Sequence, residues 1–172
     1  MFIPSPCGSL PNASAPIRGN FHHLDSMYGV SYVGRMNRTE LQNLAEERLA
    51  DGELLLANGR YGAAYYIVGY AVECGLKACI AKLTRAEDFY DKILARKIFT
   101  HNLKELADHA RLSDVFTQTS KKDQLFAANW AQVSLWSEES RYDAHTQQDA
   151  EQLIGAVRDP AHGVMQCIRQ YW

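Results

Sequence analysis

The sequence predicts an all-α fold, with four to five main helices packed as a bundle and short helices connecting them. Apolar residues recur at helical spacing in several stretches after residue 36. No stretch alternates apolar and polar residues as a half-buried strand does, and no Gly-rich phosphate loop or internal repeat is present. At 172 residues, the chain is long enough for one domain with its own hydrophobic core.

Residues 1–35 differ in composition from everything after them. Four prolines, separated by glycine, serine and asparagine, prevent a regular helix there. No apolar run of signal-peptide length follows a basic start. We therefore expect a flexible N-terminal arm over residues 1–35 and a helical domain over residues 36–172.

The first helix is predicted from Thr39 to Asn58. Thr39 and Gln42 have the spacing of a capping box, and Asn58 with Gly59 supplies a stop signal. Between these signals, apolar or small residues share one face at helical period: Leu41, Leu44, Ala45, Leu49, Gly52, Leu55 and Leu56. This pattern is typical of an amphipathic helix that pairs with the next helix through a tight turn.

The second helix, from Tyr61 to Lys82, is predicted to be the central one. It is apolar or small on nearly every face, so other elements must enclose it. Glu73 and Lys77 are the two charges within it, four residues apart with the acid first, which is the favourable order for a helical pair. Because the uncharged run stops short of the roughly 20 residues that cross a bilayer, we expect no membrane span.

Shorter elements are predicted to follow. Thr84 to Glu87 has the pattern of a capping box before a short helix that reaches Leu94. A further helix is expected from about Thr100 to Ala110, and Ser113 is expected to open a short turn. Next comes a helix from Ser120 to Trp136, whose apolar members are Leu125, Phe126, Trp130, Val133 and Trp136.

A polar break from Ser137 to His145 precedes the last helix, which Thr146 and Asp149 are expected to cap. Apolar residues then keep one helical phase to the end of the chain: Ala150, Leu153, Ile154, Val157, Ala161, Val164, Met165, Ile168 and Trp172. Because this phase continues past Pro160, we expect the proline to bend the helix and not to end it.

The charge and the cysteines restrict the possible functions. A net charge of -2 argues against binding through a broad basic surface. From Lys82 to Lys122 there are nine Lys/Arg and six Asp/Glu, and this excess of three fits either a modest cationic groove or a solvated face. The four cysteines lack metal-finger spacing. We expect a reducing, cytoplasmic compartment, no metal and no cofactor.

Five short motifs occur in a distinctive order from about Met36 to the C-terminus. They are Gly59-Arg60-Tyr61, Glu73-x-x-x-Lys77-Ala78, His101-Asn102-Leu103, Ser140-Arg141-Tyr142 and Asp149-Ala150-Glu151. Their order and spacing resemble the HEPN family, the "higher eukaryotes and prokaryotes nucleotide-binding" domains. The resemblance implies a HEPN-like helical bundle and an association with RNA or nucleotides.

The resemblance also implies a candidate catalytic pair. HEPN proteins that cleave RNA without metal use an arginine and a histidine with four to six residues between them, and Arg141 and His145 are the matching candidates here. Only three residues separate them, and Tyr142 stands where a polar residue is common. If this segment is helical, both side chains share one face. His101 resembles the family's His-x-Leu position, with a capping or packing role as the alternative.

A structural role for Arg141 is the competing hypothesis. A buried, unpaired Glu73 would be costly, and the planar guanidinium of an arginine suits a partly buried carboxylate. The stem of Lys77 is long enough to carry its ammonium to solvent. We therefore expect a contact between Glu73 and Arg141, with Glu73, Lys77, Tyr142 and His101 in binding or structural roles and His145 exposed before the Thr146 cap.

Three functions remain open. The first is a nucleotide- or RNA-associated interaction module, in a toxin–antitoxin or defence system, beside a nucleotidyltransferase-type partner. The second is a metal-independent endoribonuclease toxin that uses Arg141 and His145, and the third is a purely structural oligomerisation domain. We also expect a homodimer, because three Trp and nine Tyr exceed what the core can bury and aromatic residues are enriched at interface cores.

Overall fold

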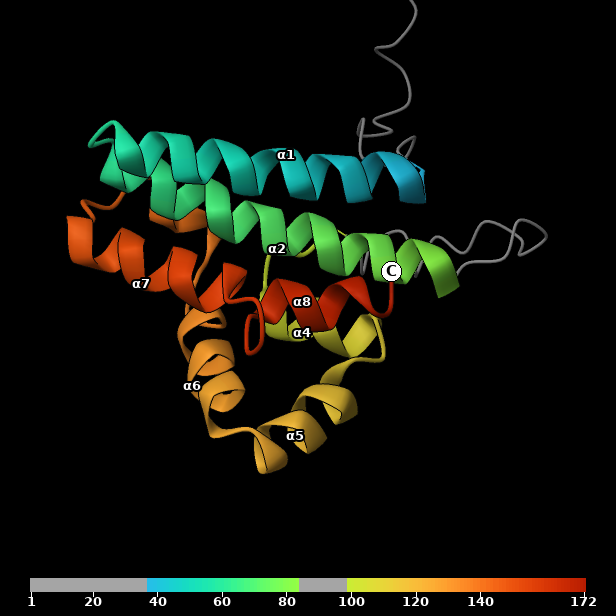
Figure 1. Cartoon of the computed structure of the whole chain (residues 1–172). Helices are drawn as coiled ribbons and strands as arrows, with labels where there is room; N and C mark the ends of the chain where they lie inside the picture. The colour runs from blue at the N-terminus through green and yellow to red at the C-terminus, as the bar shows by residue number, and fades with distance from the viewer. Residues whose placement is uncertain (1–36, 84–98) are drawn as a thin grey trace, which may run out of the picture. The chain divides into compact units, whose positions relative to one another are not determined.

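The structure is a computed structural model that describes residues 37–83 and 99–172. All regular secondary structure in these two ranges is helical, which confirms the all-α prediction (Figure 1). The elements are α1 (Arg38–Ala57), α2 (Tyr61–Leu83), α4 (Leu103–His109), α5 (Ser113–Lys122), α6 (Gln124–Val133), the 3-10 turn η2 (Glu138–Arg141), α7 (Gln147–Arg158) and α8 (Val164–Arg169). The arm predicted over residues 1–35 and the short helix predicted after Thr84 lie outside the described residues.

Helix α1 begins two residues before the predicted capping box. Asn37 is the N-cap: its Oδ1 accepts from the Glu40 amide at 3.0 Å, and its own amide donates to Glu40 Oε2 at 2.9 Å. The Thr39–Gln42 box is therefore wrong, because Asn37 and Glu40 satisfy the free amides first. The helix ends as expected: Asn58 is the C-cap, and Gly59 adopts a φ of 69°, which favours glycine.

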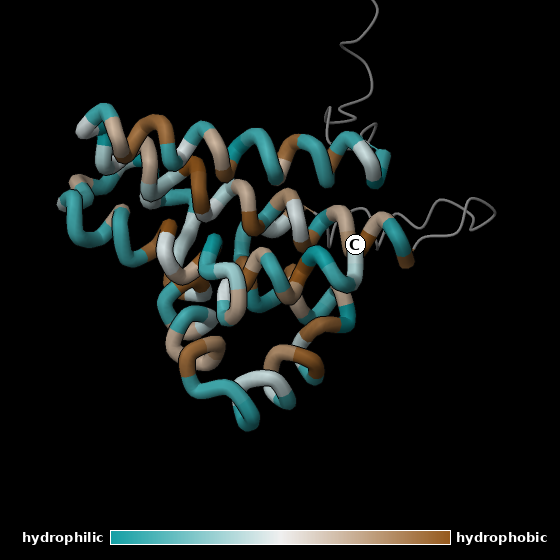
Figure 2. The backbone as a smooth tube through the Cα atoms, in the orientation of Figure 1, coloured by the Kyte–Doolittle hydropathy of each residue, from teal (hydrophilic) through white to brown (hydrophobic). Residues whose placement is uncertain are grey.

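Helix α2 is the enclosed centre of the bundle, as predicted. Fourteen of its 23 residues are buried, and α1, α4, α7 and α8 pack around it. Hydrophilic and hydrophobic residues alternate along α1 (Figure 2), and its buried residues are Leu41, Ala45, Leu49 and Gly52. Gly52 of α1 lies against Val68, so close that a Cβ there would overlap the valine.

The middle of the chain differs from the prediction. Ser113 opens a full helix, α5, and the expected helix from Ser120 to Trp136 is divided at Asp123. The Asp123 carboxylate caps α6 by accepting from the amides of Leu125 and Phe126, both at 3.0 Å. The division also turns Leu125 outward, where it is exposed, while Phe126 stays in the core.

The C-terminal helix is also divided. Thr146 and Asp149 form the predicted capping box of α7, but the helix ends at Arg158, and the continuous bent helix through Pro160 is wrong. Asp159 is extended, as the residue before a proline usually is, and its Oδ1 accepts from the Ala161 amide at 2.8 Å. The apolar residues of α8 still reach the core: Val164, Met165, Cys167 and Ile168.

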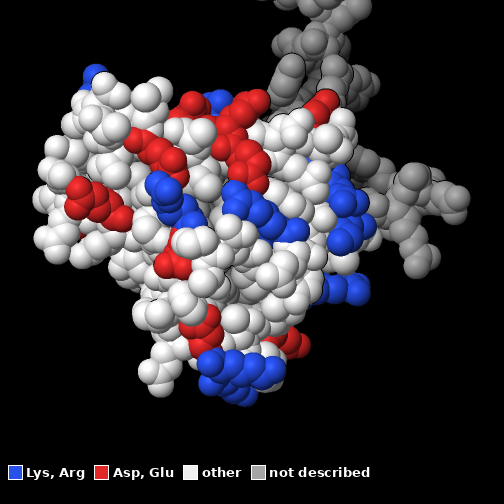
Figure 3. All heavy atoms as spheres, in the orientation of Figure 1, with Lys and Arg blue, Asp and Glu red and all other residues white. Residues whose placement is uncertain are grey.

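Within residues 37–83 and 99–172, no helix is long and apolar enough to cross a membrane. Basic and acidic side chains are interspersed over α1 and α7 on the face shown in Figure 3. That face therefore carries no broad basic surface.

Candidate functional site

The polar break between α6 and α7 folds against the central helix. It begins beyond Trp136, whose indole is 3% exposed and packs directly on Gly69 of α2. The turn η2 follows, with Ser140 buried and Arg141 exposed at its end. A glycine at position 69 lets the indole approach the helix backbone, and this contact fixes the start of the break on α2.

A buried charge pair lies within α2. Glu73 is 0% exposed and Lys77 is 5% exposed. The Lys77 ammonium donates to Glu73 Oε1 at 2.7 Å. Both charges are removed from water, so each depends on the other for its neutralisation.

His101 extends this pair to the surface. Its Nδ1 lies 3.0 Å from Glu73 Oε2, and its Nε2 lies 2.8 Å from Glu138 Oε2 in η2. Each ring nitrogen therefore lies within hydrogen-bond distance of a carboxylate oxygen. The chain Lys77–Glu73–His101–Glu138 thus joins α2, the residue before the α4 N-cap, and η2.

The expected contact between Glu73 and Arg141 is wrong. The Glu73 oxygens are occupied by Lys77 and His101. The stem of Lys77 does not carry its ammonium to solvent, because the carboxylate lies within reach on the next turn of the same helix. His101, expected as a capping or packing residue, is the second partner of the buried carboxylate.

Arg141 lies beside two tyrosines, of which Tyr142 is exposed and Tyr66 is partly buried; these three residues are here called the Arg141 patch. The guanidinium carbon lies 4.8 Å from the centroid of the Tyr142 ring, and Tyr142 is 74% exposed. A hydrogen bond with the Tyr142 side chain is the main cause that raises the pKa of Arg141, with a smaller contribution from Tyr66. The patch therefore offers a permanent cation beside one accessible aromatic ring, that of Tyr142.

His145 is partly buried and not exposed as expected. Its ring stacks on Tyr65 of α2, with centroids 3.8 Å apart and an angle of 12° between the planes. Its Nε2 is buried and has no hydrogen-bond partner among the described residues. Residues 142–146 are not helical, so the same-face argument for Arg141 and His145 does not hold, and no hydrogen bond or ion pair within the described ranges joins them.

The cysteines and the acidic residues give no metal site in the part of the chain that the structure describes. Within these residues, no group of three His, Cys, Asp or Glu side chains could hold a metal ion. Cys74, Cys79 and Cys167 are free and buried. Burial raises the pKa of the Cys74 and Cys79 thiols to about 12, which keeps them protonated and unreactive.

Sequence reasoning missed three residues of the site. Tyr65 and Tyr66 were part of the apolar pattern of the central helix, and their adjacent positions place their rings on different sides of it, one on His145 and one beside Arg141 and Trp136. Glu138 gave no local signal, because its role depends on a histidine 37 positions earlier in the chain.

A comparison with protein families agrees with the motif order. The family model of the HEPN domain matches residues 39–159, which is more than half of the chain. No curated protein and no solved structure gave a significant match. The matched region runs from α1 to the end of α7 and includes the buried charge pair and the Arg141 patch. The chain therefore belongs to the HEPN family.

Proposed function

We propose that the protein is a cytoplasmic interaction module that binds single-stranded RNA at the Arg141 patch without cleaving it. The observation that carries this proposal is the exposed guanidinium of Arg141 lying over Tyr142, itself largely exposed. Proteins recognise unpaired RNA by stacking bases on aromatic rings or on arginine planes and by pairing phosphates with cations. Membership of the HEPN family is consistent with a nucleotide- or RNA-related function.

The charge distribution favours a small local site. With a net charge of -2, long-range attraction to RNA is weak, so affinity must come from a few contacts. We expect a shallow salt dependence, with a slope that corresponds to about one or two phosphates.

The alternative function is a metal-independent endoribonuclease. The unpartnered, buried Nε2 of His145 favours it, because an imidazole nitrogen free of protein partners is available to a substrate. In this function the Tyr65–His145 stack holds the imidazole while Arg141 binds the phosphate. Because that nitrogen is buried, a substrate reaches it only after residues 142–146 move. A composite site formed where two chains of a homodimer meet is one arrangement that exposes it.

The proposed partners follow from the family. We infer a homodimer and a nucleotidyltransferase-type partner protein, within a toxin–antitoxin or defence system. The exposed apolar residues give surfaces for such contacts: Leu54, Leu125, Leu135 and Tyr142.

The test is a titration of a short fluorescent single-stranded RNA with the full chain and its variants. Tyr142→Ala removes one stacking ring and should weaken binding by about 1–3 kcal/mol, and Arg141→Ala should weaken it by a similar amount. Arg158→Ala is the matched control, since Arg158 is an exposed arginine on α7 that pairs with Glu53 at 3.1 Å; its effect should be within twofold.

The same samples give the cleavage result. Intact RNA after long incubation supports the interaction module, whereas cleavage that is lost in His145→Ala supports the endoribonuclease. If no RNA binds, or if Arg141→Ala and Arg158→Ala lose equal affinity for RNA, RNA binding at the Arg141 patch is rejected. A structural oligomerisation domain is then the remaining function.

A further inference from the structure

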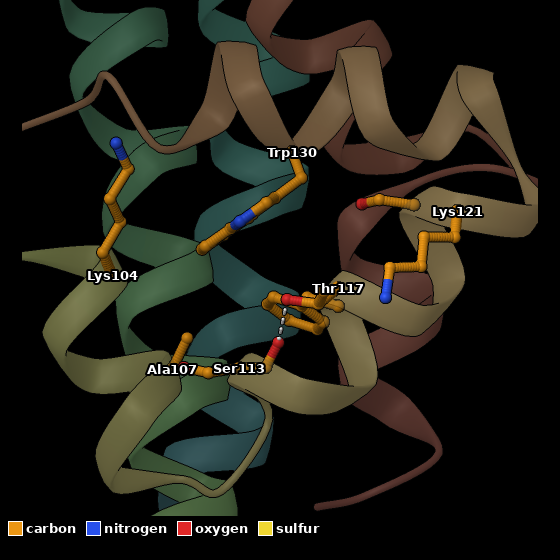
Figure 4. A pocket seen from close by; sticks show the side chains of 8 residues that line it. Lys104, Ala107, Ser113, Thr117, Lys121 and Trp130 are labelled. Atoms are coloured by element: carbon orange, nitrogen blue, oxygen red, sulfur yellow. Dashed lines mark hydrogen bonds between the residues drawn. The ribbon is translucent and has the colours of Figure 1, made fainter.

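A second concave surface lies between α4, α5 and α6, formed by residues that the Arg141 patch does not use. Its volume is about 470 Å³, within the range of roughly 300–1,000 Å³ typical of small-molecule sites. One lysine comes from α4 and one from the end of α5, and Trp130 of α6 forms a wall between them (Figure 4).

The Trp130 indole that forms the wall of the pocket packs on the hydrophobic core. Trp130 packs on Phe116 with ring centroids 4.6 Å apart and planes at 61°, and Phe116 makes a similar edge contact with Phe126 at 5.6 Å. Phe116 and Phe126 are each 2% exposed, whereas Trp130 is only partly buried. The indole is therefore supported by the core and still open to the pocket.

The polar lining carries one sign of charge. Lys104 and Lys121 are exposed and form no ion pair or side-chain hydrogen bond with residues 37–83 or 99–172, and none of the eight lining residues is acidic. Ser113 and Ser120 add hydroxyl groups, while the Thr117 hydroxyl is already used in a bond to the Ser113 carbonyl at 2.8 Å. Two ammonium groups and two hydroxyls beside a ring suit an anion that is attached to a planar group.

We propose that this pocket binds a small aromatic phosphate ester, with its ring stacked on Trp130 and its phosphate paired with Lys104 or Lys121, which lie on opposite sides of the indole. The proposal goes beyond RNA binding at the Arg141 patch and does not depend on it, because the two sites share no residue. Two classes of compound have a ring and a phosphate in one molecule: a nucleoside monophosphate, with the phosphate on its ribose, and an aryl phosphate, with the phosphate on the ring.

Calorimetric titration of the full chain at low salt with four probes tests the proposal. The probes are 1-naphthyl phosphate, adenosine 5′-monophosphate, 1-naphthol and inorganic phosphate. We expect at least one of the two aryl or nucleoside phosphates to bind at least tenfold more tightly than 1-naphthol and inorganic phosphate. The probe that binds more tightly shows whether the pocket prefers a nucleoside phosphate or an aryl phosphate.

Three variants locate the binding. The double variant Lys104→Gln with Lys121→Gln should bind the phosphate probe at least tenfold more weakly. Lys122 is an exposed neighbouring lysine outside the pocket, and Lys122→Gln should change the affinity for the probe less than twofold. Trp130→Phe keeps a ring on Phe116, and it should reduce the advantage of the aryl phosphate over inorganic phosphate.

Several results would overturn the proposal. Equal affinity for 1-naphthol and 1-naphthyl phosphate would show an apolar cleft only, and equal affinity for inorganic phosphate would show unspecific attraction of anions. A loss of binding in Arg141→Ala would place the probe at the other site. Because Arg141→Ala also tests RNA binding, failure of one site is distinguishable from failure of the other.

Discussion

Replacing Glu73 with alanine tests the buried charge network directly. The carboxylate is fully buried, 2.7 Å from the Lys77 ammonium and 3.0 Å from His101 Nδ1. Its removal leaves the Lys77 charge with no partner inside the bundle. His101 is less affected, because its side chain is 44% exposed and keeps Glu138.

The magnitude follows from the burial. Loss of one partner of a buried pair costs about 3–5 kcal/mol, because the remaining charge stays out of water. The matched control is Glu46→Ala: Glu46 accepts two hydrogen bonds from Arg169, at 2.7 and 2.6 Å, but is exposed on the surface. Such exposed pairs contribute at most about 1 kcal/mol. We therefore expect Glu73→Ala to lower the free energy of unfolding at least threefold more than Glu46→Ala.

Urea unfolding followed by circular dichroism measures both effects. The double variant Glu73→Leu with Lys77→Met should recover most of the loss, since an apolar pair of similar volume replaces a buried ion pair at little cost. Arg141→Ala should change the free energy of unfolding by less than about 0.5 kcal/mol, as an exposed residue does. If Glu73→Ala costs no more than Glu46→Ala, or Arg141→Ala costs several kcal/mol, the assignment of the Glu73 partners is refuted.

Three further predictions concern other parts of the bundle. The hydrogen bond between His162 Nδ1 and Asp123 Oδ2, 2.7 Å long, is the main cause that raises the pKa of His162 and lowers that of Asp123. The stability that this bond contributes is fully present from about pH 4 to 6.5. It is lost as pH rises through the folded pKa of His162, and it is lost as pH falls through the folded pKa of Asp123. The thermal unfolding temperature of Asp123→Asn should therefore vary less with pH than that of the wild type, and an unchanged pH profile would contradict this. Gly69→Ala forces a Cβ into the Trp136 indole and should cost about 1–3 kcal/mol in urea unfolding, with Gly155→Ala, which meets nothing within 4 Å, as the control that should show no loss. Light scattering at tens of micromolar should give a dimer, and a monomer would remove the composite endoribonuclease site.

The elements predicted well are those whose signals are local. The enclosed helix α2 follows from a long run of small and apolar residues that only Glu73 and Lys77 interrupt before Lys82, and the Thr146–Asp149 box follows from a spacing of three. The break at Pro160 was missed because the apolar phase continues across it, and the break at Asp123 was missed because no glycine or proline marks it. A short connection of suitable length returns the next helix to the same side of the core, so periodicity alone does not distinguish one bent helix from two.

The sequence predicted that Glu73 requires a cationic partner, but it did not predict which residues are its partners. That Glu73 requires a buried cation follows from its place in an apolar helix. Which cation fills that need depends on the folded positions of α4 and η2, and the nearest candidate along the helix, Lys77, was discounted because of its long stem. In the structure, the carboxylate one turn away holds that stem inside.

The network also affects how variants of the Arg141 patch are interpreted. Glu138 and Arg141 belong to the same four-residue turn, η2, and Glu138 is fixed by His101. A variant at His101 therefore releases one end of the turn that carries Arg141, without touching RNA. If RNA binds at the patch, Glu138→Gln should weaken binding in parallel with His101→Ala, because either change weakens the contact that holds η2 in place. A direct contact of His101 with RNA would instead leave Glu138→Gln at wild-type affinity.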